Sequence, residues 1–216
     1  MLILGANGFA KEVLEIVHTL KQLENTCFYD DVSEIVPDKL FCLFPVIRTI
    51  GEAMEYFQTI DKRFVLGLGN PFLRKTLCDK FESIGGVLKS TISPMAFIGS
   101  YDVEIGIGTN VLHGAIVSNG SKLGKGCILY YNSIITHDCV IGDFVEISPA
   151  VTILGRCKIG SYTQIGSNAT ILPDITIGQN VIIGAGSVVT KDVPDNAMVI
   201  GVPARVVKVL NSSEIL

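Results

Sequence analysis

The sequence predicts two structural units of different class, a small α/β Rossmann-like domain followed by a parallel β-helix built from hexapeptide repeats. Two observations predict this. Aliphatic residues recur every six positions from Ile105 to Val189, and strand and helix patterns alternate in the residues before them. We therefore expect the α/β domain over residues 1–88, the β-helix over 89–204 and a short tail over 205–216.

The repeat indicates the number of sides of the β-helix. A period of six fits neither a helix of about 3.6 residues per turn nor an alternating strand, but it fits short parallel strands that each end in a corner. A second period places a glycine after the aliphatic residue every eighteen positions, at Gly106, Gly124, Gly142, Gly160 and Gly178. Three hexapeptides therefore make one coil.

The aliphatic residues are expected to point into the prism, where each stacks on its counterpart in the next coil. Four positions after each of them comes an uncharged and nearly always small residue that also faces inward, close to a corner. Cys127, Cys139 and Cys157 occupy this companion position, so we interpret them as apolar filling. The chain has no Cys-x-x-Cys pair, and the sequence predicts no metal site.

Breaks in the period mark the two ends of the β-helix. Ile92 and Ile98 follow the pattern with a slip of one residue, so the β-helix is expected to begin near residue 90. Pro194 and the Gly-Val-Pro-Ala motif at residues 201–204 interrupt the period at the other end.

The N-terminal residues follow the order of a βαβ unit. Strand patterns at 1–4, 27–29 and 64–67 alternate with helical patterns at 11–20 and 71–81. This order is typical of small nucleotide-binding domains, whose ligands collect at the carboxyl ends of the strands.

Glycine and polar residues follow those strands. The first turn departs from the Gly-x-Gly-x-x-Gly pattern, so it indicates either a phosphate site at a helix start or only a sharp turn. The paired aspartates after the second strand could bind a ligand, but they are equally typical of a helix cap or a turn. The candidates at the strand ends are Asn7, Gly8, Phe9, Asp30, Asp31, Gly69 and Asn70.

Composition excludes several classes of protein. The formal net charge is −4 and no run of Lys or Arg stands out, which argues against a nucleic-acid partner. The sequence contains no apolar stretch of the length that spans a membrane, and its first residues do not form a signal sequence. We therefore expect no membrane partner and a cytoplasmic location.

The three histidines differ in their place relative to the repeat. His18 falls within the first predicted helix, where a structural or surface role is expected. His113 and His137 follow ladder positions by two residues and are 24 residues apart, which is no multiple of eighteen, so they lie on different faces. In neighbouring coils, Gly155 and Asn119 occupy the position equivalent to His137.

We interpret His137 as a general base, the alternative being a polar surface histidine at a corner. Asp138 is the candidate that orients the imidazole, with Glu146 in reserve. Because Gly155 has no side chain, it leaves room for a thin substrate and exposes an N–H that suits a developing oxyanion.

Five motifs together resemble those of the sialic-acid O-acetyltransferase and nucleotide-aminosugar N-acetyltransferase family. They lie at residues 5–11 (Gly-Ala-Asn-Gly-Phe-Ala-Lys), 29–31 (Tyr-Asp-Asp), 67–70 (Gly-Leu-Gly-Asn), 135–139 (Ile-Thr-His-Asp-Cys) and 201–204. The resemblance implies a left-handed β-helix and a homotrimer with active sites between neighbouring subunits. It also implies that the N-terminal domain binds a nucleotide-linked sugar while acetyl-CoA lies along the β-helix.

The same resemblance implies which residues contact acetyl-CoA. Members use solenoid groove positions, mostly through backbone groups, and basic residues near the phosphates, although a solvated basic residue is the alternative for the latter. The matching positions here are Gly155, Ser167, Ala185, Lys191 and Arg205. Phe9 and Glu146 stand where many members carry histidine, which leaves the sugar and the nucleotide open.

The expected function is transfer of an acetyl group from acetyl-CoA to an amine or hydroxyl of a nucleotide-linked sugar, with N- and O-transfer left open. A zinc enzyme of the γ-carbonic-anhydrase kind is disfavoured because three converging histidines are lacking. A Rossmann oxidoreductase is disfavoured by the imperfect glycine turn. A non-catalytic trimeric β-helix with a nucleotide-binding head remains the main alternative.

Overall fold

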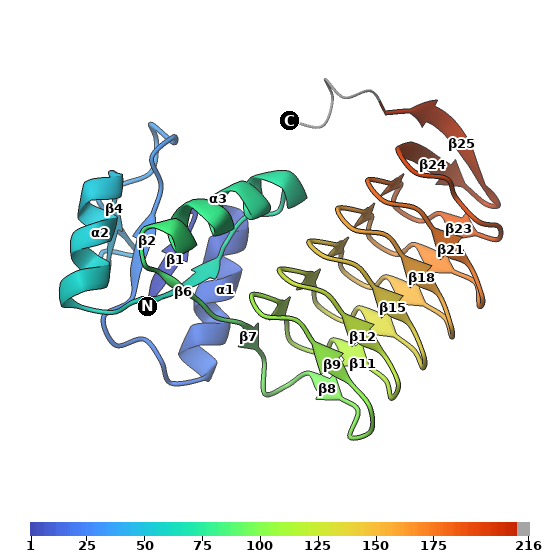
Figure 1. The fold of residues 1–216 in the computed structure, drawn as a ribbon, viewed down its shortest axis with the longest axis horizontal. Coiled ribbons are helices and arrows are strands. Elements are labelled where there is room, and N and C mark those ends of the chain that lie inside the picture. Colours follow the sequence, from blue (N-terminus) through green and yellow to red (C-terminus); the bar gives the residue numbers. More distant parts are fainter. Residues whose placement is uncertain (211–216) are drawn as a thin grey trace.

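The computed structural model describes residues 1–210, which form an α/β domain and a three-sided parallel β-helix (Figure 1). The α/β domain has three helices, α1 (Gly8–Thr19), α2 (Ile50–Thr59) and α3 (Pro71–Ser83). Its sheet has the order β3 (Lys39–Leu40), β4 (Phe44–Ile47), β2 (Cys27–Tyr29), β1 (Leu2–Leu4), β5 (Arg63–Leu66) and β6 (Val87–Leu88).

Strand β1 lies at the point where the strand order reverses. It pairs in parallel with β2 on one side and with β5 on the other. In such a sheet the loops that leave the two sides of this point diverge and open a crevice at the carboxyl ends of the strands. The predicted strand–helix order of this domain is therefore confirmed.

The middle of the α/β domain was not predicted. Along the chain, strands β3 and β4 and helix α2 come after β2 and before β5. Helix α2 begins with a capping box, in which Thr49 Oγ1 accepts from the Glu52 N–H at 3.2 Å and the Glu52 carboxylate accepts from the Thr49 N–H at 2.9 Å. The Thr-x-x-Glu spacing is the sequence signal for this helix.

The β-helix consists of three sheets, named here sheets I, II and III. Sheet I contains β7 (Thr91–Ile92), β10 (Asn110–Val111), β13 (Ile128–Leu129), β16 (Glu146–Ile147), β19 (Gln164–Ile165), β22 (Ile182–Ile183), β24 (Ala197–Gly201) and β25 (Ala204–Val209). Sheet II contains β8 (Phe97–Ile98), β11 (Ile116–Val117), β14 (Ile134–Ile135), β17 (Thr152–Ile153), β20 (Thr170–Ile171) and β23 (Val188–Val189). Sheet III contains β9 (Glu104–Ile105), β12 (Lys122–Leu123), β15 (Val140–Ile141), β18 (Lys158–Ile159) and β21 (Thr176–Ile177).

Strand register confirms the eighteen-residue coil. Ile135 pairs with Val117 in the preceding coil and with Ile153 in the following one. The slip predicted at the start is also present, because Asn110 pairs with Thr91. At the far end β24 and β25 form an antiparallel pair, so the expected tail is a strand as far as Val209, and residues 211–216 lie outside the described part of the chain.

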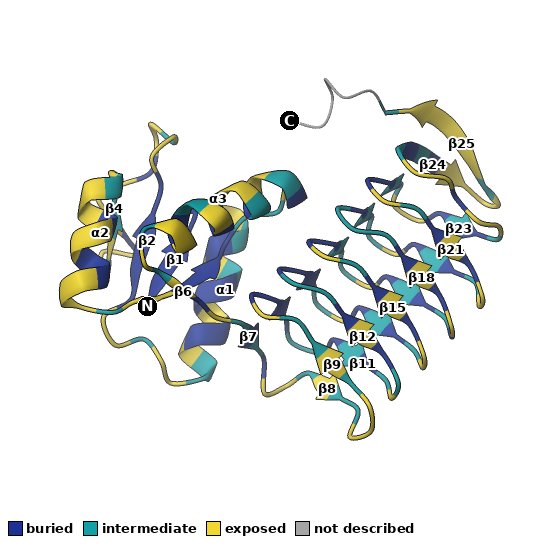
Figure 2. Ribbon diagram, viewed as in Figure 1, coloured by how far each residue is buried: buried dark blue, intermediate teal, exposed yellow. Residues whose placement is uncertain are grey.

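The aliphatic ladder and its companion residues form one continuous core (Figure 2). Ile135, Ile153 and Ile171 have no exposed surface, and Cys127, Cys139 and Cys157 are equally buried among them. Burial raises the pKa of the Cys127 thiol to about 11, as expected of a thiol that serves as apolar filling. The interpretation of these cysteines as core is confirmed.

The periodic glycines allow consecutive coils to approach closely at one corner. A Cβ atom on Gly106 would lie 2.4 Å from the backbone of Gly124, and one on Gly160 would lie 2.4 Å from the backbone of Gly178. No side chain fits at these distances, which explains why glycine recurs at this position.

Arg74 on α3 joins the α/β domain to the β-helix. Its side chain has no exposed surface. It donates to the backbone carbonyls of Gly126 at 3.1 Å and Phe144 at 2.6 Å in the β-helix, and to that of Gly69 in the loop after β5. Asn110 adds a second link, because its Nδ2 donates to the Leu66 carbonyl at 2.7 Å.

No helix among residues 1–210 combines the length and the apolar character needed to cross a membrane.

The stacked core generates a first prediction. Ile153→Ala should lower the free energy of unfolding by about 2–5 kcal/mol, because it removes buried methyl groups and leaves a cavity in a ladder that cannot collapse. Val140→Ala is the matched control, since Val140 is 48 % exposed on the outer face of sheet III. Urea denaturation monitored by circular dichroism measures both, and equal losses in the two variants would contradict the ladder.

The junction generates a second prediction. Arg74→Ala should lower the free energy of unfolding by about 3–5 kcal/mol, because it leaves buried carbonyls and the nearby Glu146 carboxylate without their cation. Lys75→Ala on the exposed side of the same helix should leave it nearly unchanged. The same denaturation assay compares them, and an Arg74→Ala protein as stable as the Lys75→Ala protein would rule out this role for Arg74.

Candidate active site

A cavity of about 340 Å³ opens at the carboxyl ends of β1, β2 and β5. Its walls come from the turns that follow these three strands, from the first turn of α1 and from α3. The structure thus brings together five of the residues predicted for the nucleotide, which are Asn7, Phe9, Asp30, Asp31 and Gly69. Their convergence follows from the reversal of strand order at β1.

The two aspartates of this cavity have different partners. The Asp30 carboxylate accepts from the N–H groups of Val32 at 3.2 Å and Ser33 at 2.8 Å, so it holds a turn, which is the structural alternative that the sequence left open. Asp31 lies nearer the exterior, where it accepts from Tyr29 Oη at 2.8 Å and has Lys80 Nζ at 3.5 Å.

The first turn of α1 is open toward the cavity. Asn7 occupies the N-cap position, but its side chain makes no capping bond and instead donates to Ser33 Oγ at 2.9 Å. A Cβ atom on Gly8 would meet nothing within 4 Å. The free N–H groups of this helix start therefore suit an anionic group. Asn70, by contrast, caps α3 by accepting from the Leu73 N–H at 3.0 Å.

His137 lies on the corner between sheets II and III. Its Nδ1 is 2.8 Å from Asp138 Oδ2, and its side chain is 54 % exposed. When Nδ1 carries the proton and donates it to this carboxylate, Nε2 is left as the proton acceptor. Gly155 lies directly against the ring, since a Cβ atom on it would be 2.5 Å from the imidazole Cε1. This is the pair of neighbours that the period predicted.

The backbone beside His137 offers a free donor. No group in residues 1–210 accepts a hydrogen bond from the Gly155 N–H. One coil along the same corner, the Arg156 side chain donates to the Asp174 carboxylate at 2.6 and 2.7 Å, and this interaction lowers the pKa of Asp174. The corner thus presents a half-exposed base next to an unpaired N–H, an arrangement suited to acyl transfer.

Glu146 is not a partner of His137 within one chain. It lies on sheet I, with its carboxylate 4.0 Å from Arg74 Nη1 and next to Gly69. Burial raises the pKa of Glu146, and the positive charge of Arg74 opposes that shift. The reserve candidate for orienting the imidazole is therefore wrong for a single chain, and Asp138 occupies that place.

The residues expected to contact CoA lie on two corners and one end of the β-helix. Gly155 is on the corner between sheets II and III, whereas Ser167 and Ala185 are stacked on the corner between sheets I and II. Lys191 and Arg205 line one cavity of about 230 Å³ beside the last strands. One chain thus brings the two basic residues together, but it does not bring Gly155 together with Ser167.

The other two histidines lie elsewhere. His113 is on the corner between sheets I and II, with its Nδ1 2.5 Å from Ser93 Oγ, which confirms that it and His137 are on different faces. His18 is exposed on α1, 3.9 Å from the Glu15 carboxylate.

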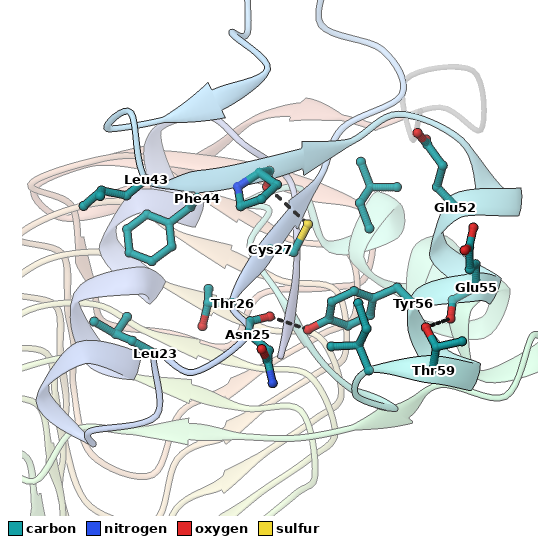
Figure 3. Close-up of a pocket in the computed structure, with 13 residues that line it drawn as sticks. Leu23, Asn25, Thr26, Cys27, Leu43, Phe44, Glu52, Glu55, Tyr56 and Thr59 are labelled. Carbon is teal, nitrogen blue, oxygen red and sulfur yellow. Dashed lines mark hydrogen bonds between the residues drawn. The ribbon is translucent and has the colours of Figure 1, made fainter.

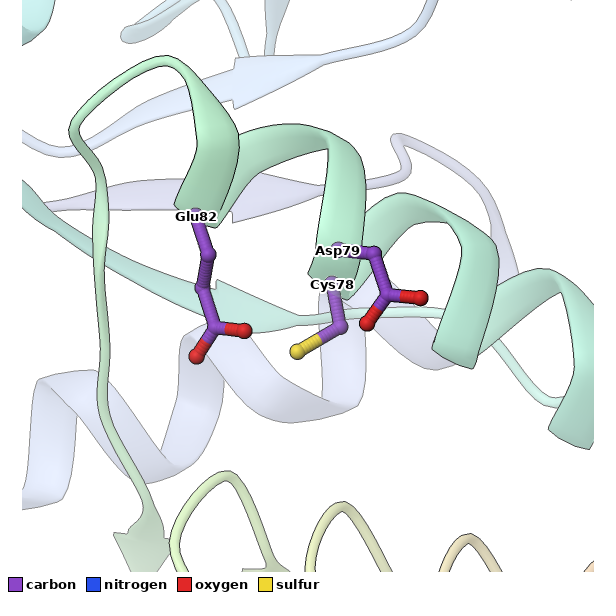
Figure 4. Close-up of side chains that lie close together, drawn as sticks. All are labelled: Cys78, Asp79 and Glu82. Carbon is purple, nitrogen blue, oxygen red and sulfur yellow. The ribbon is translucent and has the colours of Figure 1, made fainter.

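Two further features lie apart from these residues. A groove between β4, α2 and the loop before β2 is lined mainly by apolar side chains, together with Glu52 and Glu55 (Figure 3). On α3, Cys78, Asp79 and Glu82 lie within 4.8 Å of one another (Figure 4). Lysines already pair with both of these carboxylates, and burial raises the pKa of the thiol to about 11, so the group is a poor set of metal ligands.

Known proteins share both halves of this arrangement. Residues 1–81 match the PglD N-terminal domain family, and residues 138–172 and 156–191 match the bacterial transferase hexapeptide (six repeats) family. The acetyltransferase domain of PglB from Neisseria gonorrhoeae is 30 % identical, over 95 % of this chain and 98 % of that one, with a TM-score of 0.86.

Two further structures extend the comparison. Perosamine N-acetyltransferase from Caulobacter crescentus, solved as a histidine-to-asparagine mutant with CoA and GDP-perosamine, is 28 % identical over 96 % of both chains, with a TM-score of 0.88. WeeI from Acinetobacter baumannii is 27 % identical over 95 % of this chain and 98 % of that one, with a TM-score of 0.72. Fold, motifs and near-complete coverage agree, and the chain belongs to the hexapeptide-repeat, left-handed β-helix family of nucleotide-sugar acetyltransferases.

Proposed function

We propose that the protein transfers an acetyl group from acetyl-CoA to an amine or hydroxyl of a nucleotide-linked sugar, with His137 as the general base. The observation that carries this proposal is the imidazole held by Asp138 at 2.8 Å and packed against the bare backbone of Gly155. Relatives that were solved with CoA and with a nucleotide-linked amino sugar support the two substrate classes.

The chemistry requires one base and one oxyanion donor. Nε2 of His137 takes a proton from the attacking nitrogen or oxygen as a bond forms to the thioester carbon. The Gly155 N–H donates to the carbonyl oxygen, on which negative charge develops. The C–S bond then breaks, and the CoA thiolate leaves and takes up a proton. Asp138 keeps the imidazole in place and stabilises its cation.

We assign the two substrates to different domains. In this proposal residues 1–88 bind the nucleotide through Asn7, Gly8, Phe9, Asp31 and Gly69, whose cavity meets the open start of α1. Asp30 shapes the turn beside it and Asn70 the start of α3.

The β-helix, residues 89–204, binds acetyl-CoA in our proposal. In this proposal the pantetheine arm of acetyl-CoA passes Gly155, Ser167 and Ala185, while Lys191 and Arg205 approach its phosphates. Arg205 lies on β25, at the end of the β-helix to which we assign the CoA phosphates. The reaction uses a thioester and a histidine base, and the proposal includes no resident metal.

The separation of these groups supports a homotrimer, which is part of our proposal. Glu104, Lys122 and Lys158 give sheet III a charged outer face, whereas the outward residues of sheet II are all uncharged. Those residues are Phe97, Ile116, Ile134, Thr152, Thr170 and Val188. If sheet II packs around a threefold axis, the corner with His137 in one subunit meets the corner with Ser167 and Ala185 in the next.

This assembly gives the separated residues a common groove. Gly155 of one subunit then faces Ser167 of the partner subunit, which one chain alone does not achieve. We further propose that the enzyme acts in the cytoplasm, where acetyl-CoA and nucleotide sugars are both available.

The base generates a third prediction. His137→Ala should lower kcat by roughly a hundredfold to ten-thousandfold, because proton removal is lost, while the affinity for the nucleotide sugar changes little. Thiol release from acetyl-CoA in the presence of UDP-, dTDP-, GDP- and CMP-linked sugars measures turnover. His18→Ala, on the exposed face of α1, is the control. Undiminished turnover by His137→Ala would overturn the assignment and favour a binding module.

The assembly generates a fourth prediction. Ile134→Glu should dissociate the trimer and abolish turnover, because it places a charge on the face that is proposed to be buried between subunits. Val140→Glu, which adds the same charge to the exposed face of sheet III, should leave a fully active trimer. Light scattering gives the mass of each variant, and a monomeric native protein, or a trimeric Ile134→Glu protein, would exclude this interface.

A further inference from the structure

Glu146 has a carboxylate without a hydrogen-bond donor. Its side chain is only 17 % exposed, yet no group in residues 1–210 donates a hydrogen bond to it. The nearest cation is Arg74 Nη1 at 4.0 Å, and the Arg74 guanidinium donates to backbone carbonyls instead. No fully buried side-chain oxygen or nitrogen in residues 1–210 lacks a partner, so the Glu146 oxygens still reach water, and a ligand that displaces this water has to supply the donor.

The carboxylate lies beside the nucleotide cavity. Glu146 leaves the outer face of sheet I between Ile128 and Gln164 and points toward the α/β domain, whereas the next residue, Ile147, points into the core. A Cβ atom on Gly69 would lie 3.7 and 4.0 Å from the two carboxylate oxygens. Since Gly69 lines the cavity, Glu146 lies next to the edge of the cavity that Gly69 forms.

The chemistry of a nucleotide sugar limits which of its parts can bind next to the Glu146 carboxylate. The diphosphate is anionic and offers only acceptors, so a carboxylate repels it. Next to Glu146, the rings of Phe9 and Tyr130 pack with their centroids 5.0 Å apart and form an apolar wall. The sugar, which lies beyond the diphosphate, is the part that carries N–H and O–H donors.

We propose that Glu146 accepts an N–H of the sugar's acceptor amine and thereby makes the enzyme prefer an amine to a hydroxyl. This inference rests on the proposed trimeric acetyltransferase. A neutral amine has two N–H donors, one for His137 of the partner subunit and one for Glu146. A hydroxyl has a single donor and leaves one of the two acceptors unpaired.

The proton balance is consistent with this arrangement. As the C–N bond forms and the C–S bond breaks, His137 of the partner subunit takes one proton from the nitrogen. The other N–H stays on the nitrogen, becomes the amide N–H of the product, and continues to donate to Glu146. A site whose buried acceptor lacks its donor discriminates strongly against the analogue that cannot supply it.

The test compares amines with matched hydroxyls. Native protein and Glu146→Gln are assayed with acetyl-CoA and GDP-perosamine, with UDP- and dTDP-linked amino sugars, and with analogues that carry a hydroxyl in place of each amine. We expect kcat/KM for the amines to fall by about tenfold or more in Glu146→Gln, and that for the hydroxyls by less than about threefold. Glu104→Gln, whose carboxylate pairs with Lys122 on sheet III, is the matched control and should behave as the native protein.

The pH dependence gives a second readout. Burial raises the pKa of Glu146, against the opposing charge of Arg74, and only the ionised carboxylate accepts from the amine at both oxygens. Amine transfer by the native protein should therefore decline as the pH falls through this raised pKa. The corresponding limb of the profile should be missing in Glu146→Gln, which has no titrating group at this position.

Calorimetric binding of GDP, UDP and dTDP separates recognition of the sugar from damage to the fold. Unchanged affinity for the nucleoside diphosphates, together with a lost preference for amines, supports the proposal. An unchanged preference, or an equal loss of nucleoside diphosphate binding, overturns it. If the native protein acetylates none of these sugars, the proposed function fails instead. Glu146 is then tested by calorimetry alone, in which Glu146→Gln must weaken binding of the amino sugars and not of their hydroxyl analogues.

Discussion

Parallel pairing of strand residues eighteen positions apart, from β9 to β23, is the constraint on which the rest of the structure depends. Ile134, for example, pairs with Thr152, and its N–H donates to the carbonyl of the preceding residue, Val151, at 2.8 Å; the same pairing repeats from coil to coil. The offset stacks the aliphatic ladder, and it also decides which backbone lies beside His137. A glycine occurs at that place, so the same winding that buries the core leaves an imidazole next to an open peptide group.

A buried cation, Arg74, is a main link between the α/β domain and the β-helix. Arg74 ties the loop that ends at Gly69 to carbonyls of two consecutive coils, so the nucleotide cavity has a defined position relative to sheet I. This position brings Glu146 next to the edge of the cavity. The contact that packs the two domains therefore also holds the carboxylate to which we assign recognition of the acceptor amine.

The sequence predicts the β-helix well because its signal is local and repeated: the period alone gives the strands, the coil length, the buried cysteines and the pairing of His137 with Gly155. It predicts less of what depends on contacts between domains. Arg74 shares a helix face with Pro71, Cys78 and Phe81, and a charge on an otherwise buried face was the available signal. Nothing in the repeat reveals that Glu146 faces the nucleotide domain.

The central claim is that each active site is built from two chains, and mixed trimers test it most directly. Gly8→Asp adds a charge at the open start of α1, where a side chain meets nothing, and so should block the diphosphate without harming the fold. Gly8→Asp chains and His137→Ala chains are each inactive alone. When they are co-assembled at equal amounts, about a quarter of native turnover should return, because in about a quarter of the sites an intact His137 of one chain meets an intact nucleotide cavity of the neighbouring chain. Mixed trimers without activity would show that each chain holds a complete site and would contradict the account.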